Sequence, residues 1–161
     1  MLIKFLTTGG TIDKVYFDAR SEYQVGSPQV LEILKDHNVA FEYEVISILQ
    51  KDSLDMTADD RQTLRRAVEA EACERIVITH GTDTMVDSAR ALLGLSGKTI
   101  VFTGALEPAR SRYTDAIFNV GCAITAVQTL SPGVYLAMSG RVYAAERVQK
   151  NYETRRFEEV S

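Results

Sequence analysis

Short apolar runs alternate along the chain with longer amphipathic segments. The segments with the length of strands cover residues 2–7, 43–49, 76–79, 99–103 and 134–138, and residues 43–49 alternate apolar and polar side chains. Apolar residues at helical spacing between them predict helices that begin at Ser27, Thr57, Thr84 and Thr114. Ser27 before Pro28 is typical of an N-cap, and Thr57 with Asp60 is typical of a capping box. Strands that alternate with helices are parallel strands joined by crossover connections.

Several of the predicted strands are apolar at consecutive positions, which indicates burial on both faces. We therefore predict one three-layer α/β domain over residues 1–161. It is of the flavodoxin-like or Rossmann-like kind, with a mostly parallel sheet and helices on both of its faces. The helix from Thr84 is expected to reach residue 93 before Gly94. Residues 20–26 read as an irregular surface loop, and residues 142–148 as a further short strand or turn.

Composition narrows the class of protein without defining it. The chain has 161 residues, of which 45% are hydrophobic and 25% charged, as in an average globular domain. The net charge of −4 argues against nucleic acid as a partner. No run approaches the ~20 apolar residues that span a membrane. Cys73 and Cys122 lie in helix-like segments without metal-ligand spacing, so we expect free thiols in the cytoplasm and no metal or other cofactor.

Glycines follow the predicted strands at positions where ligands bind in a parallel sheet. They are Gly9, Gly10, Gly81, Gly104 and Gly140. The carboxyl ends of parallel strands meet at one edge, where crevices form. Two of these turns add hydroxyl groups, namely residues 7–11 (Thr-Thr-Gly-Gly-Thr) and residues 79–84 (Thr-His-Gly-Thr-Asp-Thr).

The two turns admit several interpretations from their residues alone. The first lacks the spacing of a dinucleotide fingerprint or a phosphate-binding P-loop, so it is either a structural turn or a loop that presents Thr11 as a nucleophile. Thr82 and Asp83 either cap the following helix or help to activate that nucleophile. Backbone N–H groups beside paired glycines can also stabilise a developing oxyanion.

The same two turns resemble the two signature motifs of the bacterial-type L-asparaginase family. The segments are Thr8-Gly9-Gly10-Thr11-Ile12 and residues 79–85, and the segment Gly104-Ala105-Leu106-Glu107-Pro108 resembles a third, in which the family usually has Met-Arg in place of Leu106 and Glu107. The resemblance covers nearly the whole chain. It corresponds to the N-terminal domain of longer members, as in short single-domain forms.

The resemblance implies roles for residues in the first half of the chain. Thr11 matches the nucleophile that attacks the side-chain amide, and Tyr23 matches a tyrosine of a mobile loop that bonds to that nucleophile. Ser53 matches the serine that holds the substrate α-carboxylate, although Leu54 follows it where the family often has glutamine. Tyr23 and Ser53 are otherwise an ordinary loop aromatic and a plain loop serine. Gly10 is expected to lie against the substrate.

The second motif and a late lysine complete the implied site. Thr82 would position or activate water, Asp83 would hold the substrate ammonium, and Gly81 would lie beside the substrate. Lys150 matches the lysine of a Thr–Lys–Asp network, which requires its ammonium to be withdrawn from solvent. The alternative for Lys150 is a solvated pair with Glu153.

The activity implied by the resemblance is hydrolysis of the side-chain amide of L-asparagine to L-aspartate and ammonia. Thr11 would form an acyl-enzyme that water resolves, although a direct attack by water held by Thr82 stays open. A glutaminase or another small-amide hydrolase also stays open, because one methylene group in the substrate gives little discrimination between asparagine and glutamine. A non-catalytic amino-acid-binding module is the third alternative. The expected partners are a small amino-acid amide and further copies of the chain, as a homodimer or homotetramer.

Overall fold

A computed structural model describes all residues from 1 to 161 and confirms the three-layer α/β fold. Its central sheet has six strands in the order β4-β1-β5-β6-β7-β8. Five of them are parallel, and β8 runs antiparallel at one edge. These strands are β1 (Leu2–Gly9), β4 (Glu42–Lys51), β5 (Arg75–Thr79), β6 (Thr99–Thr103), β7 (Gly133–Met138) and β8 (Arg141–Ala144).

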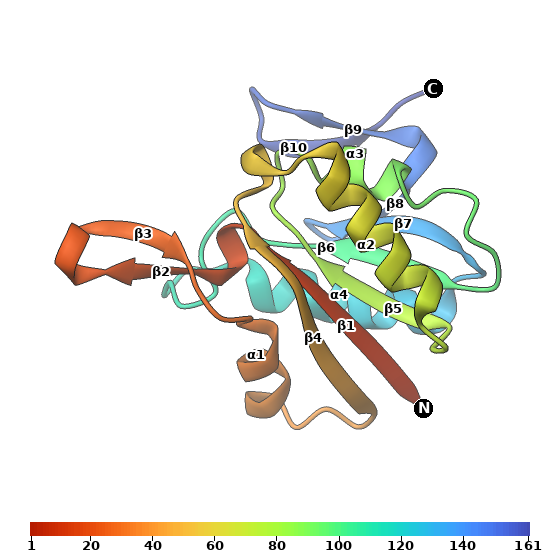
Figure 1. Cartoon of the computed structure of the whole chain (residues 1–161), viewed down its shortest axis with the longest axis horizontal. Coiled ribbons are helices and arrows are strands. Elements are labelled where there is room, and N and C mark those ends of the chain that lie inside the picture. Colours follow the sequence, from red (N-terminus) through yellow and green to blue (C-terminus); the bar gives the residue numbers. More distant parts are fainter.

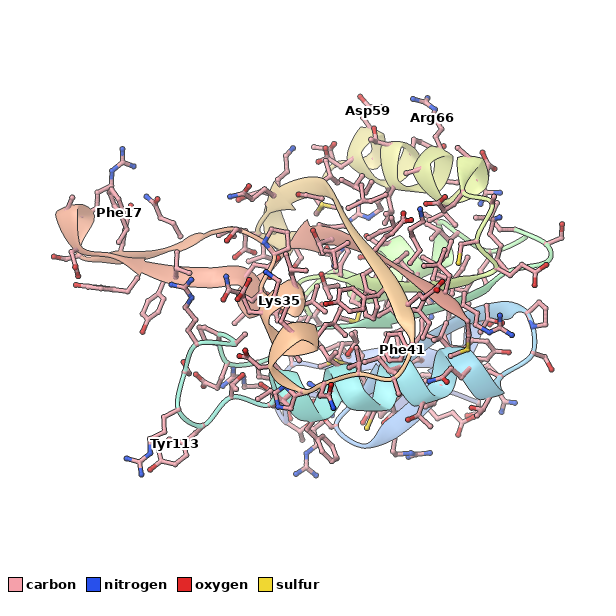
Figure 2. The ribbon with its side chains drawn as sticks, turned by 90° about the horizontal axis from the view of Figure 1, so that it is seen from below. Phe17, Lys35, Phe41, Asp59, Arg66 and Tyr113 are labelled. Carbon is pink, nitrogen blue, oxygen red and sulfur yellow. The ribbon has the colours of Figure 1, made fainter.

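Helices cover both faces of the sheet (Figures 1 and 2). They are α1 (Val30–Asp36), α2 (Ala58–Ala70), α3 (Met85–Arg90) and α4 (Ala116–Thr129). One core lies under α2 and α3 and the other under α1 and α4. Successive side chains of a strand point into opposite cores: Ile76 and Ile78 are buried in the first core, and Val77 is buried in the second. This division explains why Ile76, Val77 and Ile78 are apolar at consecutive positions.

Two hairpins lie outside the central sheet. The first pairs β2 (Lys14–Phe17) with β3 (Glu22–Val25), and the second pairs β9 (Val148–Asn151) with β10 (Arg156–Glu159). Figure 1 shows β2 and β3 extending well away from the body of the molecule. The interpretation of residues 20–26 as an irregular loop is therefore wrong, because much of that segment is a strand paired with β2. The segment 142–148 contains the end of β8 and the start of β9.

Helix starts and ends test the local predictions. The capping box of Thr57 and Asp60 is confirmed in both directions. The cap at Ser27 is wrong: α1 begins later, and the Gln29 N–H before it donates to the carboxylate of Asp13 at 2.8 Å. The predicted helix of residues 84–93 ends at Arg90, and turns follow it. Cys73 lies in the loop after α2 rather than in a helix, and both cysteines are free.

The strand order determines where a ligand crevice can form. Taken along the chain, the parallel strands β1, β4, β5, β6 and β7 have the spatial order 2-1-3-4-5. In such sheets there is one pair of neighbouring strands whose following connections run to opposite faces of the sheet. A crevice opens between these two connections, beyond the carboxyl ends of the strands. Here that pair is β1 and β5. The two threonine-containing turns follow these two strands directly.

Candidate active site

Three turns meet at the carboxyl edge with almost no space between their backbones. Gly10 has a φ angle of 87°, in the left-handed region. A methyl group added to it would lie 2.4 Å from the Gly81 nitrogen, and one added to Gly81 would lie 2.6 Å from the Ser53 Oγ. Both glycines are thus required for packing, and Gly10 for its conformation as well. Together they bring the first turn, the second turn and Ser53 into contact.

Lys150 connects the second turn to the hairpin of β9 and β10. Its ammonium donates to Thr82 Oγ1 at 2.8 Å and to Asp83 Oδ1 at 2.6 Å. The lysine side chain is only 7% exposed, whereas that of Asp83 is 38% exposed. The hydroxyl of Tyr152 donates to the Asp83 carbonyl at 2.9 Å, and the Lys150 ammonium lies 5.3 Å from the centre of the Tyr152 ring. Lys150 is therefore a buried cation with two hydrogen-bond partners, and it does not pair with Glu153.

The hairpin that carries Lys150 is itself fixed to the body of the domain. Val148 and Phe157 belong to the core under α2 and α3. The Tyr143 hydroxyl of β8 donates to the Phe157 carbonyl at 2.8 Å, and the Arg90 guanidinium donates to the Val148 carbonyl at 3.0 Å. The position of the lysine thus depends on packing contacts as well as on its own hydrogen bonds.

A small cavity of about 280 Å³ opens over these groups. It is lined by Thr11, Thr82, Asp83, Leu106, Lys150, Tyr152 and Arg155. Thr11 begins a short 3₁₀ helix (Thr11–Asp13) after β1, and its hydroxyl makes no hydrogen bond to another protein group. The volume lies near the lower end of the range of about 300–1,000 Å³ for ligand pockets, which suits a small molecule. No group of three or more His, Cys, Asp or Glu side chains is arranged to hold a metal ion.

A buried histidine supports the second turn from behind. His80 is fully buried, and burial lowers its pKa to about 4, so the ring is neutral near pH 7. Its Nδ1 lies 2.7 Å from the Gly81 carbonyl and therefore carries the proton that is donated there. Its Nε2 accepts from the Ser88 hydroxyl at 2.8 Å, and Ser88 accepts from Arg61 at 3.2 Å. This chain of bonds fixes the carbonyl that precedes Thr82.

Leu106 is placed in the cavity wall by a second set of polar contacts. The Asp115 carboxylate accepts from the backbone N–H groups of Leu106 and Glu107 at 3.0–3.1 Å. Asn119 donates to the Gly104 carbonyl at 2.9 Å and also to Asp115. The loop between β6 and α4 is therefore ordered by two side chains near the start of α4. The sequence motifs alone indicate no role for Leu106.

Four of the sequence-predicted site residues do not line this cavity, namely Ser53, Tyr23, Gly10 and Gly81. Ser53 is 2% exposed, and its side chain faces Gly81, while its carbonyl accepts from Thr84 at 2.7 Å. Tyr23 lies on β3, is 59% exposed, and packs edge-on against Tyr16 with ring centres 5.5 Å apart. The structure thus brings Thr11, Thr82, Asp83 and Lys150 together. Gly10 and Gly81 form the backbone contact between the two turns, and Tyr23 lies on the projecting hairpin.

Asp13 lies at the base of that hairpin, two residues after Thr11. It is 1% exposed, and burial raises the pKa of its carboxyl to about 7. Its carboxylate accepts from Gln29, and its carbonyl accepts from the Gly26 N–H at 2.7 Å. A carboxyl group that holds its proton up to about pH 7 is therefore part of the connection between the cavity and the hairpin.

The cavity residues missed by sequence reasoning are Leu106, Tyr152 and Arg155. Tyr152 and Arg155 belong to the turn between β9 and β10, whose pairing was not predicted. The sequence offers one indication of Tyr152 and Arg155. They follow Lys150 closely, and a hairpin turn directly after a buried lysine keeps its side chains near that lysine. That signal is clear only once Lys150 is known to be buried.

The fold and the cavity define an α/β protein with a threonine, lysine and aspartate cluster at the crevice between β1 and β5. The chain matches the family described as Asparaginase, N-terminal over residues 2–159 and belongs to it. It is 31% identical over 157 residues to the L-asparaginase of Thermococcus kodakarensis, covering 93% of this chain and 48% of that protein.

Another relative has a different name. The chain is 29% identical to a glutamyl-tRNA(Gln) amidotransferase subunit of Haloquadratum walsbyi, covering 96% of this chain and 38% of that protein. Among solved structures, the thermostable L-asparaginase from Thermococcus kodakarensis matches with a TM-score of 0.85 at 29% identity, over 99% of this chain and 51% of that one. The chain therefore spans about half the length, or less, of these proteins.

Proposed function

We propose that the protein hydrolyses the side-chain amide of L-asparagine to L-aspartate and ammonia. The observation that carries the proposal is the buried Lys150 ammonium, bonded to both Thr82 and Asp83 in the cavity that Thr11 also lines. Membership of the asparaginase family and the name of the Thermococcus relative support the same chemistry. The size of the cavity suits an amino acid rather than a larger amide.

In the first half of the proposed reaction, Thr11 Oγ1 attacks the amide carbon of the substrate. The Thr11 proton is transferred to the departing nitrogen, the C–N bond breaks, and ammonia leaves. The Thr82 oxygen already accepts a hydrogen bond from the Lys150 ammonium, so its own O–H is directed elsewhere. The nearby ammonium stabilises the negative charge that develops on oxygen, an effect that is strong where water is excluded.

In the second half, water attacks the acyl group on Thr11 and aspartate is released. Thr82 is the group proposed to position that water. Direct attack on the amide by a water held at Thr82, without an acyl-enzyme, is the competing route. The two routes differ in whether a covalent aspartyl group ever resides on Thr11.

The remaining roles follow from charge and position. Asp83 is partly exposed to the cavity and is proposed to bind the substrate ammonium. Gly10 and Gly81 allow the backbone to approach the substrate. Tyr23 is proposed to act only when the β2–β3 hairpin closes over the cavity, since that hairpin carries it away from the other groups. No cofactor has a part in this scheme.

A second candidate function follows from the relative named as an amidotransferase subunit. Such a role would pass the released ammonia to a partner protein instead of to solvent. We favour a free amidohydrolase, acting as a homodimer or homotetramer in the cytoplasm, where the free thiols Cys73 and Cys122 would persist. No helix is both long and apolar enough for a membrane crossing.

The test is ammonia release by the purified chain, without a partner, from L-asparagine and from L-glutamine. Thr11→Ala should abolish release while L-aspartate still binds in calorimetry. Thr63→Ala is the matched control, because its hydroxyl bonds to Asp59 on the outer side of α2 and should leave turnover unchanged. Binding without turnover in the wild-type chain would instead support a binding module, and preferred release from glutamine would support a glutaminase.

A further inference from the structure

We propose that Tyr152 is a positioning residue of the candidate site, whose hydroxyl fixes the Asp83 backbone and whose ring shields the Lys150 ammonium from water. No motif of the chain gives Tyr152 a role. The inference rests on the proposed function for the reaction that Asp83 and Lys150 serve. The protection of the ammonium can also be measured without any turnover.

Tyr152 contacts both members of the pair of Lys150 and Asp83, through different atoms. Its hydroxyl donates to the Asp83 carbonyl at 2.9 Å, and its ring centre lies 5.3 Å from the Lys150 ammonium. An ammonium within about 6 Å of the centre of an aromatic ring is attracted by the electrons of the ring face. One side chain thus joins the turn after β5 to the hairpin of β9 and β10.

The exposure of Tyr152 argues against a role in the core. Tyr152 is 66% exposed and belongs to neither core, so its replacement removes little packing. The side chain of Lys150, two residues earlier, is only 7% exposed. An exposed ring beside a buried cation is the arrangement expected of a cover, because the ring excludes water from the side of the ammonium that it faces.

The turn between β9 and β10 holds Tyr152 in place. Asn151 Oδ1 accepts from the backbone N–H groups of Glu153 and Thr154 at 3.0 and 3.2 Å. On the other side of the turn, Phe157 of β10 is buried in the core under α2 and α3. The conformation of the turn is therefore supported by contacts that a replacement of Tyr152 leaves intact.

The hydroxyl and the ring of Tyr152 should affect different steps. Asp83 is proposed to bind the substrate ammonium, so loss of the hydrogen bond to its carbonyl should weaken substrate binding. Lys150 is proposed to stabilise the negative charge that develops on oxygen, and such an effect is strong only where water is excluded. Loss of the ring should therefore slow the reaction itself.

Tyr113 is a matched control for Tyr152. It is also an exposed aromatic residue outside the helices and strands, and its ring centre lies 5.4 Å from the Arg112 guanidinium. Figure 2 shows Tyr113 pointing away from the body of the molecule, and it does not line the small cavity. The same replacements at both positions thus separate the loss of an exposed tyrosine from the loss of contacts to Lys150 and Asp83.

The first experiment is steady-state kinetics of ammonia release from L-asparagine. Tyr152→Phe should raise KM about 2–10-fold, the loss of one hydrogen bond, and should leave kcat within about twofold. Tyr152→Leu should in addition lower kcat by about 3–30-fold, the loss of a cation–π contact. Tyr113→Phe and Tyr113→Leu should match the wild-type chain in both constants. An unchanged KM in Tyr152→Phe, or an unchanged kcat in Tyr152→Leu, would overturn the proposal.

The second experiment measures the shielding of the Lys150 ammonium by NMR, without turnover. In a chain made with isotopically labelled lysine, an ammonium that exchanges its protons slowly with water gives a proton–nitrogen signal. The Lys150 signal, identified by its absence from Lys150→Met, should be present in the wild-type chain and in Tyr152→Phe, and lost in Tyr152→Leu. The Lys4 ammonium, which pairs with Glu44 and Glu71, is the internal reference that should keep its signal throughout.

The NMR result also distinguishes this inference from the proposed activity. Absence of the Lys150 signal from the wild-type chain, or its persistence in Tyr152→Leu, would overturn the shielding role. If the signal depends on the Tyr152 ring as expected but the wild-type chain releases no ammonia, the proposed activity fails while the shielding of Lys150 stands.

Discussion

The cavity and the β2–β3 hairpin are held in very different ways. In the cavity, Lys150 is 7% exposed and bonded to two partners, and the turn beneath it is supported by buried His80. On the hairpin, Tyr16 and Tyr23 are more than half exposed and contact each other. The groups proposed for chemistry are thus fixed before substrate arrives, while Tyr23 is not.

The hairpin is attached to the body of the domain at its base. Val25 accepts from Gln50 at 2.9 Å, Lys14 pairs with Asp52 at 2.9 Å, and Gly26 donates to Asp13. Few buried contacts restrain the rest of it, which is typical of segments that open and close at low free-energy cost. The contrast between the two regions is what the proposed function requires, namely fixed catalytic groups and a hairpin that can close over them.

Removing the central cation should have the largest effect. Lys150→Met takes away the donor to Thr82 and the partner of Asp83, so we expect ammonia release to fall by at least about 10²–10³-fold. Lys35→Met is the control, because Lys35 forms only a solvent-exposed pair with Glu32 and should keep full turnover. Turnover within a few-fold of wild type in Lys150→Met would show that the network is structural only.

The close contact of the two turns should be nearly as sensitive. In Gly10→Ala the new methyl group meets the Gly81 backbone at 2.4 Å and a positive φ, so we expect a loss of about 2–4 kcal/mol in the free energy of unfolding. Gly121→Ala in α4 meets nothing within 4 Å and should stabilise the chain by about 0.5–1 kcal/mol. Urea unfolding measures both, and equal effects of the two variants would refute the packing argument.

Two buried titratable groups should give the two regions opposite pH dependences. The Asp13 pKa of about 7, against an ordinary value of 3.8, means that the folded chain keeps a proton which the unfolded chain releases. This retained proton stabilises the folded chain. The stabilisation is complete below pH 3.8 and is lost as the pH rises to 7. The His80 pKa of about 4, against an ordinary 6.5, means that the unfolded chain binds a proton which the folded chain excludes. The stabilisation of the folded chain by neutral His80 is complete above pH 6.5 and is lost as the pH falls to 4.

Between pH 4 and 6.5 these two contributions change stability in opposite directions, each with a slope of about 1.4 kcal/mol per pH unit. In Asp13→Asn only the His80 contribution is left, so the stability of the variant should rise with pH by about that slope relative to the wild-type chain. Urea unfolding at several pH values within this window is the measurement. Parallel stability curves for the variant and the wild-type chain would contradict the assignment to Asp13.

The smallest effect should come from the exposed tyrosines of the hairpin. If the hairpin closes over bound substrate, Tyr23→Phe should lower kcat about tenfold by removing one hydroxyl, the order of one hydrogen bond. Tyr16→Phe removes the hydroxyl of its cross-strand neighbour and should leave kcat unchanged. An equally small change in kcat in both variants would show that the two tyrosines only pack against each other and that Tyr23 takes no part in the reaction.

The fold was predictable where local and long-range signals agree. The strand at residues 99–103 is buried on both of its faces, and Thr57 caps its helix through neighbours in sequence. The prediction failed at α1, where the N-cap is Gln29 and its backbone N–H is held by the carboxyl group of Asp13, distant in sequence. It failed again at residues 20–26, because a hairpin of four-residue strands with exposed aromatics shows no core-facing pattern.

The candidate site was predictable only from motif residues at the carboxyl edge. Thr11, Thr82 and Asp83 follow strands whose order brings them together. Lys150 joins them only because Val148 and Phe157 are buried in the core, a tertiary effect that its charged surroundings conceal. Arg155 was missed for the same reason. The sequence therefore specifies the polar groups that follow the strands better than it specifies the residues of the β9–β10 turn that complete the cavity.

The central claim is that Thr11 carries the acyl group. Acid quenching of the enzyme during turnover of L-asparagine, followed by peptide mass spectrometry, tests it directly. We expect an aspartyl adduct on the peptide that contains Thr11, absent from the Thr11→Ala variant. An adduct on Thr82, or continued turnover by Thr11→Ala with no adduct, would contradict the claim.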